Sequence, residues 1–148
     1  MKIIKTSACI FFIYLFIPIF SYCQNGTYKC SSQAYTTTDK SKNKTYANNQ
    51  IITVNIHDVF GGDIILNELS ENFILKYNIL PNDKKTYTDK DDRTIIHTYF
   101  AKLVVSNIEM EERFLVGLVQ SMDNNSLNLW IFSEKHNSYN HYFNLVKL

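Results

Sequence analysis

The sequence predicts an all-β fold of about eight antiparallel strands in a meander, forming a small barrel or a curved half-open sheet. Three observations lead to this prediction. Several segments alternate apolar and polar residues with a period of two. Turns rich in Gly, Asn and Asp join these segments, and no long stretch has convincing helical spacing. Strands joined by short turns pair as antiparallel neighbours. A two-sheet sandwich is the alternative arrangement.

The clearest pair of strands flanks the polar turn at 123–126. Residues 114–119 are apolar on both faces, which predicts a strand that is covered on both sides. After the turn, apolar and other residues alternate over 127–132, a stretch that includes the single tryptophan, Trp130. We interpret the two segments as the central hairpin of the domain.

Residues 1–23 have the layout of a secretory signal peptide. Lys2 and Lys5 precede an apolar core of 13 residues, which is too short for the roughly 20 residues of a membrane span. Cleavage before Gln24 leaves a single β domain at 24–148, so we expect an exported protein, secreted or periplasmic. A cut before Cys23 with lipid attached to that cysteine is the alternative. No other segment is long and apolar enough to predict a transmembrane span.

Composition limits the partners of the mature chain. Without Lys2 and Lys5, 13 basic and 14 acidic residues remain, and this balance lacks the basic excess of nucleic-acid-binding domains. Cys30 is the one cysteine left after cleavage before Gln24, so no intramolecular disulfide is expected. We predict that Cys30 is a small buried side chain.

In the first half of the mature chain, two strands flank a polar stretch. Residues 27–32 place Tyr28 and Cys30 on one face, and 50–57 alternate in the same way. The polar stretch 33–49 predicts a solvated, mobile loop. Gly61-Gly62 predicts a turn after the second strand.

The segment 63–79 has two interpretations. Alternation from Phe73 to Ile79 predicts a strand, preceded by a turn at 69–72. Residues 63–72 fit either a further strand, which we favour, or a helix with one apolar stripe.

The second half predicts further strands joined by polar segments. We expect a polar loop at 80–93, a long strand at 94–106 and an acidic corner at 109–112 before the central hairpin. A turn at 134–138 precedes a last strand at 139–147. This strand is predicted to place Tyr139, His141, Phe143 and Leu145 on one side.

Gly26-Thr27-Tyr28 at the start of the first strand resembles the Gly-x-Trp of the lipocalin-like (calycin) superfamily. Tyr28 stands in place of the family's tryptophan, and Lys147 is the nearest basic residue to the arginine that many members have in the last strand. The resemblance implies a barrel whose interior could hold a small apolar molecule. Eight strands can equally be filled by their own side chains.

Catalytic and metal chemistry have little support in the sequence. His57-Asp58 beside Gly61-Gly62 is the closest approach to an active site, but no nucleophile motif accompanies it. The four histidines, His57, His97, His136 and His141, lack metal-ligand spacing. Asp89, Asp91 and Asp92 lack the pattern of a calcium loop. We predict a non-enzymatic protein with no catalytic residues, metal or cofactor.

Aromatic residues are spread over the predicted strands. Tyr99, Trp130, Phe132 and Tyr142 are candidate ligand-binding residues on a recognition face or cavity wall, with core packing as the other interpretation. The leading hypothesis is therefore an exported domain that binds a small apolar ligand or a protein or glycan partner. The alternative is a structural or accessory envelope protein that acts through protein contacts, for example by strand pairing at an exposed edge. Ligand identity and oligomeric state stay open at the level of the sequence.

Overall fold

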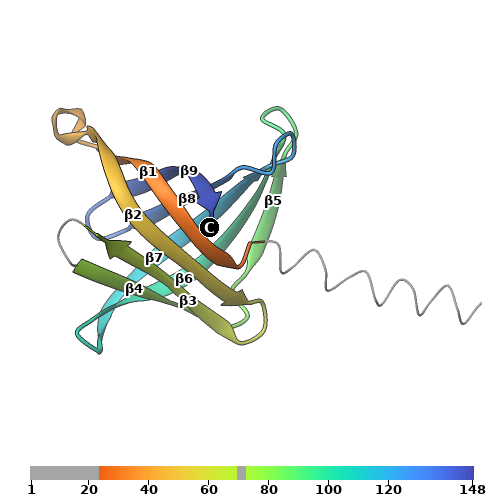
Figure 1. Ribbon diagram of the computed structural model, residues 1–148. Helices are drawn as coiled ribbons and strands as arrows, with labels where there is room; N and C mark the ends of the chain where they lie inside the picture. The colour runs from red at the N-terminus through yellow and green to blue at the C-terminus, as the bar shows by residue number, and fades with distance from the viewer. Residues whose placement is uncertain (1–23, 70–72) are drawn as a thin grey trace, which may run out of the picture.

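The computed structural model describes residues 24–69 and 73–148, which form an antiparallel β-barrel (Figure 1). Its strands are β1 (Gly26–Thr37), β2 (Lys44–His57), β3 (Gly61–Glu68), β4 (Phe73–Ile79), β5 (Lys85–Asp89), β6 (Thr94–Val105), β7 (Ile108–Ser121), β8 (Leu127–Ser133) and β9 (Ser138–Lys147). One 3-10 turn, η1 (Lys40–Lys42), joins β1 to β2. The predicted signal peptide, the alternative lipid site at Cys23 and turn residues 70–72 lie outside the described residues.

Pairing of β4 with β6 closes the sheet into a ring. The sheet order is β4-β3-β2-β1-β9-β8-β7-β6-β5, and the β4–β6 ladder joins one edge to the other. Eight strands therefore form the closed barrel, while β5 lies outside the ring and pairs with β6. The barrel prediction is confirmed, and the sandwich alternative is wrong, because one continuous sheet closes on itself.

Strands β4 and β5 lie one after the other along the same edge of β6. β4 pairs with the part of β6 at 101–104, and β5 pairs with 94–98. Between them, the Leu80 amide donates to the Phe100 carbonyl at 2.9 Å. Because β3 pairs with β4 only as far as Ile79, β5 extends the wall beyond the end of β3. This end of the barrel is consequently open on the β5 side.

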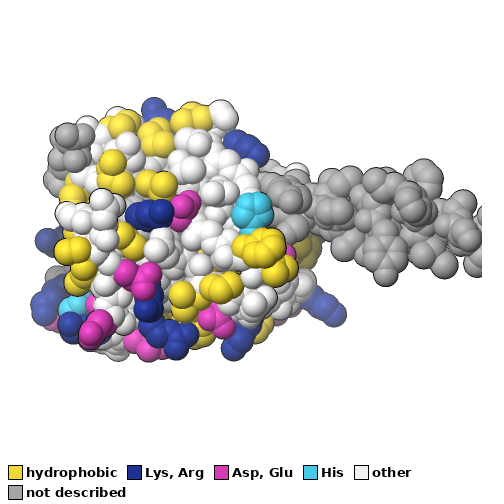
Figure 2. All heavy atoms as spheres, turned by 90° about the horizontal axis from the view of Figure 1, so that it is seen from below, with side chains coloured by type: hydrophobic (Ala, Val, Ile, Leu, Met, Phe, Trp, Pro, Cys, Tyr) yellow, Lys and Arg dark blue, Asp and Glu magenta, His cyan; other side chains and the backbone are white. Residues whose placement is uncertain are grey.

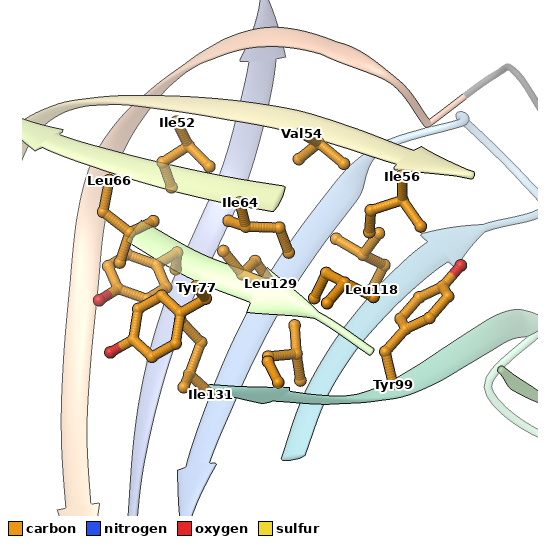
Figure 3. Close-up of a cluster of buried hydrophobic side chains, with 14 of the residues drawn as sticks. Ile52, Val54, Ile56, Ile64, Leu66, Tyr77, Tyr99, Leu118, Leu129 and Ile131 are labelled. Carbon is orange, nitrogen blue, oxygen red and sulfur yellow. The ribbon is translucent and has the colours of Figure 1, made fainter. Parts of the chain in front are cut away.

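Apolar side chains fill the middle of the barrel, as the period-two alternation predicts. Figure 3 shows side chains from β2, β3, β7 and β8 meeting there. The largest fully buried side chains are Ile52, Ile64, Leu66, Leu118, Leu129, Ile131, Val54, Val116 and Cys30. The predicted burial of Cys30 is confirmed, and burial raises the pKa of its thiol. Because the buried apolar side chains fill the middle of the barrel, the described residues leave no long, empty apolar tunnel through it.

Two predicted loops contain strands. In 33–49, β1 continues to Thr37 and β2 begins at Lys44, so the mobile-loop prediction is wrong. In 80–93, β5 pairs with β6. Both segments lie largely beyond the apolar core, so most of their side chains are polar while the backbone still pairs. Apolar alternation is therefore absent where strands nevertheless form. The acidic corner at 109–112 likewise belongs to β7.

The ambiguous segment 63–79 is β3 followed by β4, so the strand interpretation is confirmed. Ile64, Leu66, Tyr77 and Ile79 are buried, whereas Phe73 is about half exposed because β4 starts at the rim. The turn after β2 also differs in detail. It occupies 58–60, and Gly61 and Gly62 already belong to β3.

The central hairpin β7–β8 is confirmed, but one of its faces lacks a covering layer. Phe114, Val116 and Leu118 point into the barrel and are buried, whereas Leu115 and Val119 lie on the outside and are partly exposed. The expectation of a strand covered on both sides therefore holds for the inner face alone, because the described residues form one closed sheet and place no second layer outside it.

A bulge in β9 changes which residues face inwards. Tyr142 and Leu145 are both buried, although three positions separate them. Asn144 between them has a left-handed backbone (φ 52°), and its amide hydrogen is accepted by Asn128 Oδ1 at 2.8 Å. The prediction that Leu145 shares a face with Tyr139 and Phe143 is wrong because the extra residue shifts the alternation.

Candidate ligand-binding cavity

A cavity of about 960 Å³ opens at the end of the barrel that β5 extends. Three core side chains line its inner limit: Tyr28, Leu127 and Leu145. Thr86 and Thr88 of β5 line it opposite their β6 partners, His97 and Ile95. The cavity therefore combines an apolar floor with a largely polar wall. Its volume is within the usual range for small-molecule sites.

The segment before β1 is clamped against the end of β2. The Asn25 side chain accepts from the Ile56 amide and donates to the Ile56 carbonyl, both at 2.9 Å. The Tyr28 hydroxyl donates to the Gln24 carbonyl at 2.7 Å. These bonds hold the Gln24 backbone at the cavity.

Gln24 is a buried polar side chain in the cavity wall. Its exposed fraction is 9%, and its Nε2 atom has no hydrogen-bond partner among the described residues. A buried donor without an acceptor costs free energy, and such groups are rare in folded proteins. A ligand with an oxygen acceptor would satisfy it.

An ion pair bridges the open side of the barrel. Lys84, in the connection between β4 and β5, donates to both carboxylate oxygens of Asp58 at 3.0 and 2.9 Å. Asp58 belongs to the turn between β2 and β3, so the pair joins the β5 side of the cavity to β2. Both side chains are partly exposed, which keeps the charges hydrated.

His97 is held neutral at this site. Burial lowers the pKa of its imidazole and the Lys84 ammonium lowers it further, while Asp58 acts in the opposite direction. A 2.9 Å hydrogen bond joins its Nδ1 to Thr86 Oγ1. Next along the inner face, Tyr99 has its pKa raised by burial and by Asp58, so its hydroxyl stays protonated. Figure 3 shows the Tyr99 hydroxyl pointing away from the aliphatic cluster.

The four predicted ligand-binding residues lie on two different faces. Tyr99 and Tyr142 are buried inside the barrel, whereas Trp130 and Phe132 are partly exposed on its outside. On the outside, Tyr139 contacts both, with ring centroids 6.0 Å from Trp130 and 4.4 Å from Phe132. The structure thus does not bring the four residues together, and none of them lines the 960 Å³ cavity.

The other candidate residues have structural surroundings. His57 is exposed, and Asp58 is bound by Lys84. Asp89 accepts the amide hydrogens of Asp91 and Asp92, as a turn-capping aspartate does. Among the described residues, no three His, Cys, Asp or Glu side chains are placed to hold a metal ion together.

Charged groups are mixed on the surface. On the face shown in Figure 2, acidic and basic side chains are interspersed and hydrophobic groups are separate from one another. At the turn between β2 and β3, beside Asp58, Val59 and Phe60 are 58% and 84% exposed.

Across residues 24–69 and 73–148, no helix has the length and apolar character needed to cross a membrane.

Sequence patterns did not indicate the cavity residues. Gln24 and Lys84 lie outside any alternating segment, and Thr86 lies in a strand that looked like a loop. One signal for a strand was present in the sequence. Thr86 and Thr88 alternate with Lys85 and Tyr87 with a period of two, but the face that carries the two threonines is polar where a core strand would have an apolar face.

The fold and the cavity define a small closed antiparallel β-barrel with a pocket at one end. This architecture is consistent with lipocalin-like proteins but is not specific to them. No protein-family model, curated protein or solved structure matches the chain.

Proposed function

We propose that this protein is an exported, non-enzymatic binding protein that takes a small amphipathic molecule into the cavity at the β5 end of the barrel. The observation that supports the proposal most strongly is the cavity itself, with buried Tyr28, Leu127 and Leu145 on one side and polar groups on the other. Because the barrel centre is filled, the ligand lies at the open end.

A distant relation to the lipocalin-like superfamily is part of this proposal. It is supported by the meander barrel and by Gly26-Thr27-Tyr28 at the start of β1. Tyr28, which stands in place of the family's tryptophan, is a buried aromatic side chain that lines the cavity at the end of the barrel. Export is supported by the signal-peptide pattern of residues 1–23. The intact mass of the exported protein tests it, because cleavage before Gln24 and lipid on Cys23 give different masses.

Native mass spectrometry tests the binding function. The protein is purified from its own host and weighed before and after denaturation, and we expect an additional mass that denaturation removes. Ile95→Trp would place a larger ring in the cavity, since Ile95 lines it, and should reduce the fraction of the protein that carries the additional mass. Ile96→Trp is the matched control because Ile96 is the next residue of β6 and pairs with Val119 on the outer face. Equal masses bound to both variants would contradict the cavity as the site.

A second candidate function is assembly through the edge of β5. Among the described residues, β5 pairs only with β6, so its other edge has unpaired backbone groups. Such an edge can add a strand from another chain. Sedimentation velocity across a hundredfold concentration range tests this candidate, since a monomer at every concentration would rule out self-association.

A further inference from the structure

The positive end of the cavity lies beside Gln24. Lys147, from the end of β9, lines the cavity, and its Nζ donates to the Asn25 carbonyl at 3.1 Å. Its side chain passes over Gly26, where a Cβ atom would lie only 2.8 Å from Lys147 Cε. The absence of a side chain at Gly26 therefore lets the ammonium group reach the residue next to Gln24.

The charged groups that line the cavity do not balance. Lys84 is paired with Asp58, whereas no carboxylate among the described residues forms an ion pair with Lys147. His97 adds no charge at neutral pH because its pKa is lowered. Among the side chains, one positive charge remains in excess, that of Lys147, whose Nζ is held at the carbonyl of the residue next to Gln24. Cleavage before Gln24 would add the α-ammonium group of Gln24 to this positive charge, and the Nε2 donor of the same residue has no partner among the described residues. An anionic oxygen acceptor would complement both groups.

The filled interior limits how far a ligand can extend along the barrel axis. Leu127 and Leu145 line the cavity and also belong to the buried core. Beyond them, Leu118 and Leu129 are fully buried. A long acyl chain therefore has no path along the barrel axis, while a short apolar group can rest on the floor of the cavity.

From these observations we infer that the ligand is a compact amphipathic monocarboxylate. Its carboxylate accepts hydrogen bonds from Gln24 Nε2 and Lys147 Nζ, and its apolar part packs on Tyr28, Leu127 and Leu145. This inference rests on the proposed binding function, because it assigns the chemical class of ligand to the same cavity.

Calorimetric titration with three probes tests the inference on the purified protein after bound small molecules have been removed. The probes are 4-phenylbutyrate, its neutral analogue 4-phenylbutanamide, and palmitate. We expect the carboxylate to bind at least about tenfold more tightly than the amide, as for one charge-assisted hydrogen bond. Palmitate should bind more weakly than 4-phenylbutyrate. In 15N spectra, 4-phenylbutyrate should shift the side-chain amide resonances of Gln24.

Variants locate the carboxylate. Gln24→Met and Lys147→Met should each weaken 4-phenylbutyrate binding about tenfold. Lys44→Met is the control, since Lys44 starts β2 in the hairpin arm and does not line this cavity. Thermal unfolding of each variant shows whether it remains folded, and the Gln24 resonances of the unmodified protein provide a test that needs no variant.

Five outcomes would overturn the inference. Equal affinity for 4-phenylbutanamide and 4-phenylbutyrate would show that the negative charge does not contribute to binding. Equal affinity for palmitate and 4-phenylbutyrate would show that the site accepts a long acyl chain. Binding without a shift of the Gln24 resonances places the ligand elsewhere. If no probe binds while a mass co-purifies and depends on Ile95, the binding function stands and the monocarboxylate assignment fails. If no probe binds and no mass co-purifies, both proposals fail.

Discussion

The indole of Trp130 lies directly over Gly117 on the outer face of the barrel. The two residues pair across β7 and β8, and a Cβ atom on Gly117 would lie 2.0 Å from Trp130 Cε2. Gly117 thus provides the space in which the ring packs against the sheet. The indole also meets the Tyr139 ring edge-to-face, with an interplanar angle of 67°.

Gly117→Ala should destabilise the barrel by about 1–3 kcal/mol, because the indole must leave its position to avoid the new methyl group. The free energy of unfolding is measured by urea denaturation with circular dichroism, which does not depend on Trp130 as a probe. In a Trp130→Ala background the same change should cost much less, and the double-mutant cycle measures the coupling. Additive effects would show that the two residues do not constrain each other.

Asn25→Ala should cost about 2 kcal/mol of stability, since it removes two hydrogen bonds to the Ile56 backbone. It should also weaken ligand binding, because the segment that positions Gln24 is released. Urea denaturation and calorimetric titration measure the two effects. Asn55→Ala is the control, as Asn55 is an exposed asparagine on the same strand as Ile56. A stable Asn25→Ala variant with unchanged binding would contradict the clamp.

Lys84→Met should raise the pKa of His97, because the Lys84 ammonium is one of the causes that lower it. The pKa is measured by NMR titration of the imidazole resonances. Lys85→Met is the matched control, since the neighbouring Lys85 does not line the cavity. Asp58→Asn should have the opposite effect and lower the pKa further. A rise of similar size in the Lys85 variant would show that the effect comes from net charge alone.

Stability should fall as the solution is acidified below about pH 6.5. Burial lowers the pKa of both His97 and His141 from the ordinary value of 6.5, so the unfolded chain binds these protons first. Their contribution to stability is complete above pH 6.5 and decreases as pH falls towards the lower pKa of the folded state. Urea denaturation at pH 7.5, 6.5 and 5.5 measures the slope. The double variant His97→Asn/His141→Asn should be less pH-dependent over this interval, and an unchanged slope would assign the effect to other groups.

Local patterns sufficed for the strands that contribute to the core. Ile52 and Val54 on β2, or Leu129 and Ile131 on β8, alternate with polar or outward residues, so both the strand and its inner face followed from period two. The pattern failed where strands leave the core. β5 and the arms of the β1–β2 hairpin are mostly polar and lack a regular apolar alternation, although β5 pairs with β6 and the two arms pair with each other. The β1 arm also pairs with β9, which is far along the chain.

The candidate cavity could not be predicted from the sequence, because its residues come from separate parts of the chain. Gln24, Lys84 and Lys147 belong to no common motif and meet only because β1 pairs with β9 and β5 extends the edge of β6. The four aromatic residues predicted to bind a ligand lie on opposite faces of the closed sheet. Tyr99 and Tyr142 point inwards, whereas Trp130 and Phe132 point outwards. The bulge at Asn144 changes which residues of β9 face inwards after it.

The sequence by itself determined that the chain forms antiparallel strands, which residues are buried in most of them, and that Cys30 is a core residue. These properties depend on burial along one strand, which a local pattern reports. Only the tertiary structure decided that the sheet closes through β4 and β6, that its centre is filled, and that a cavity remains where β5 extends beyond β3. These properties depend on the register between distant strands, because register sets which end of the barrel stays open.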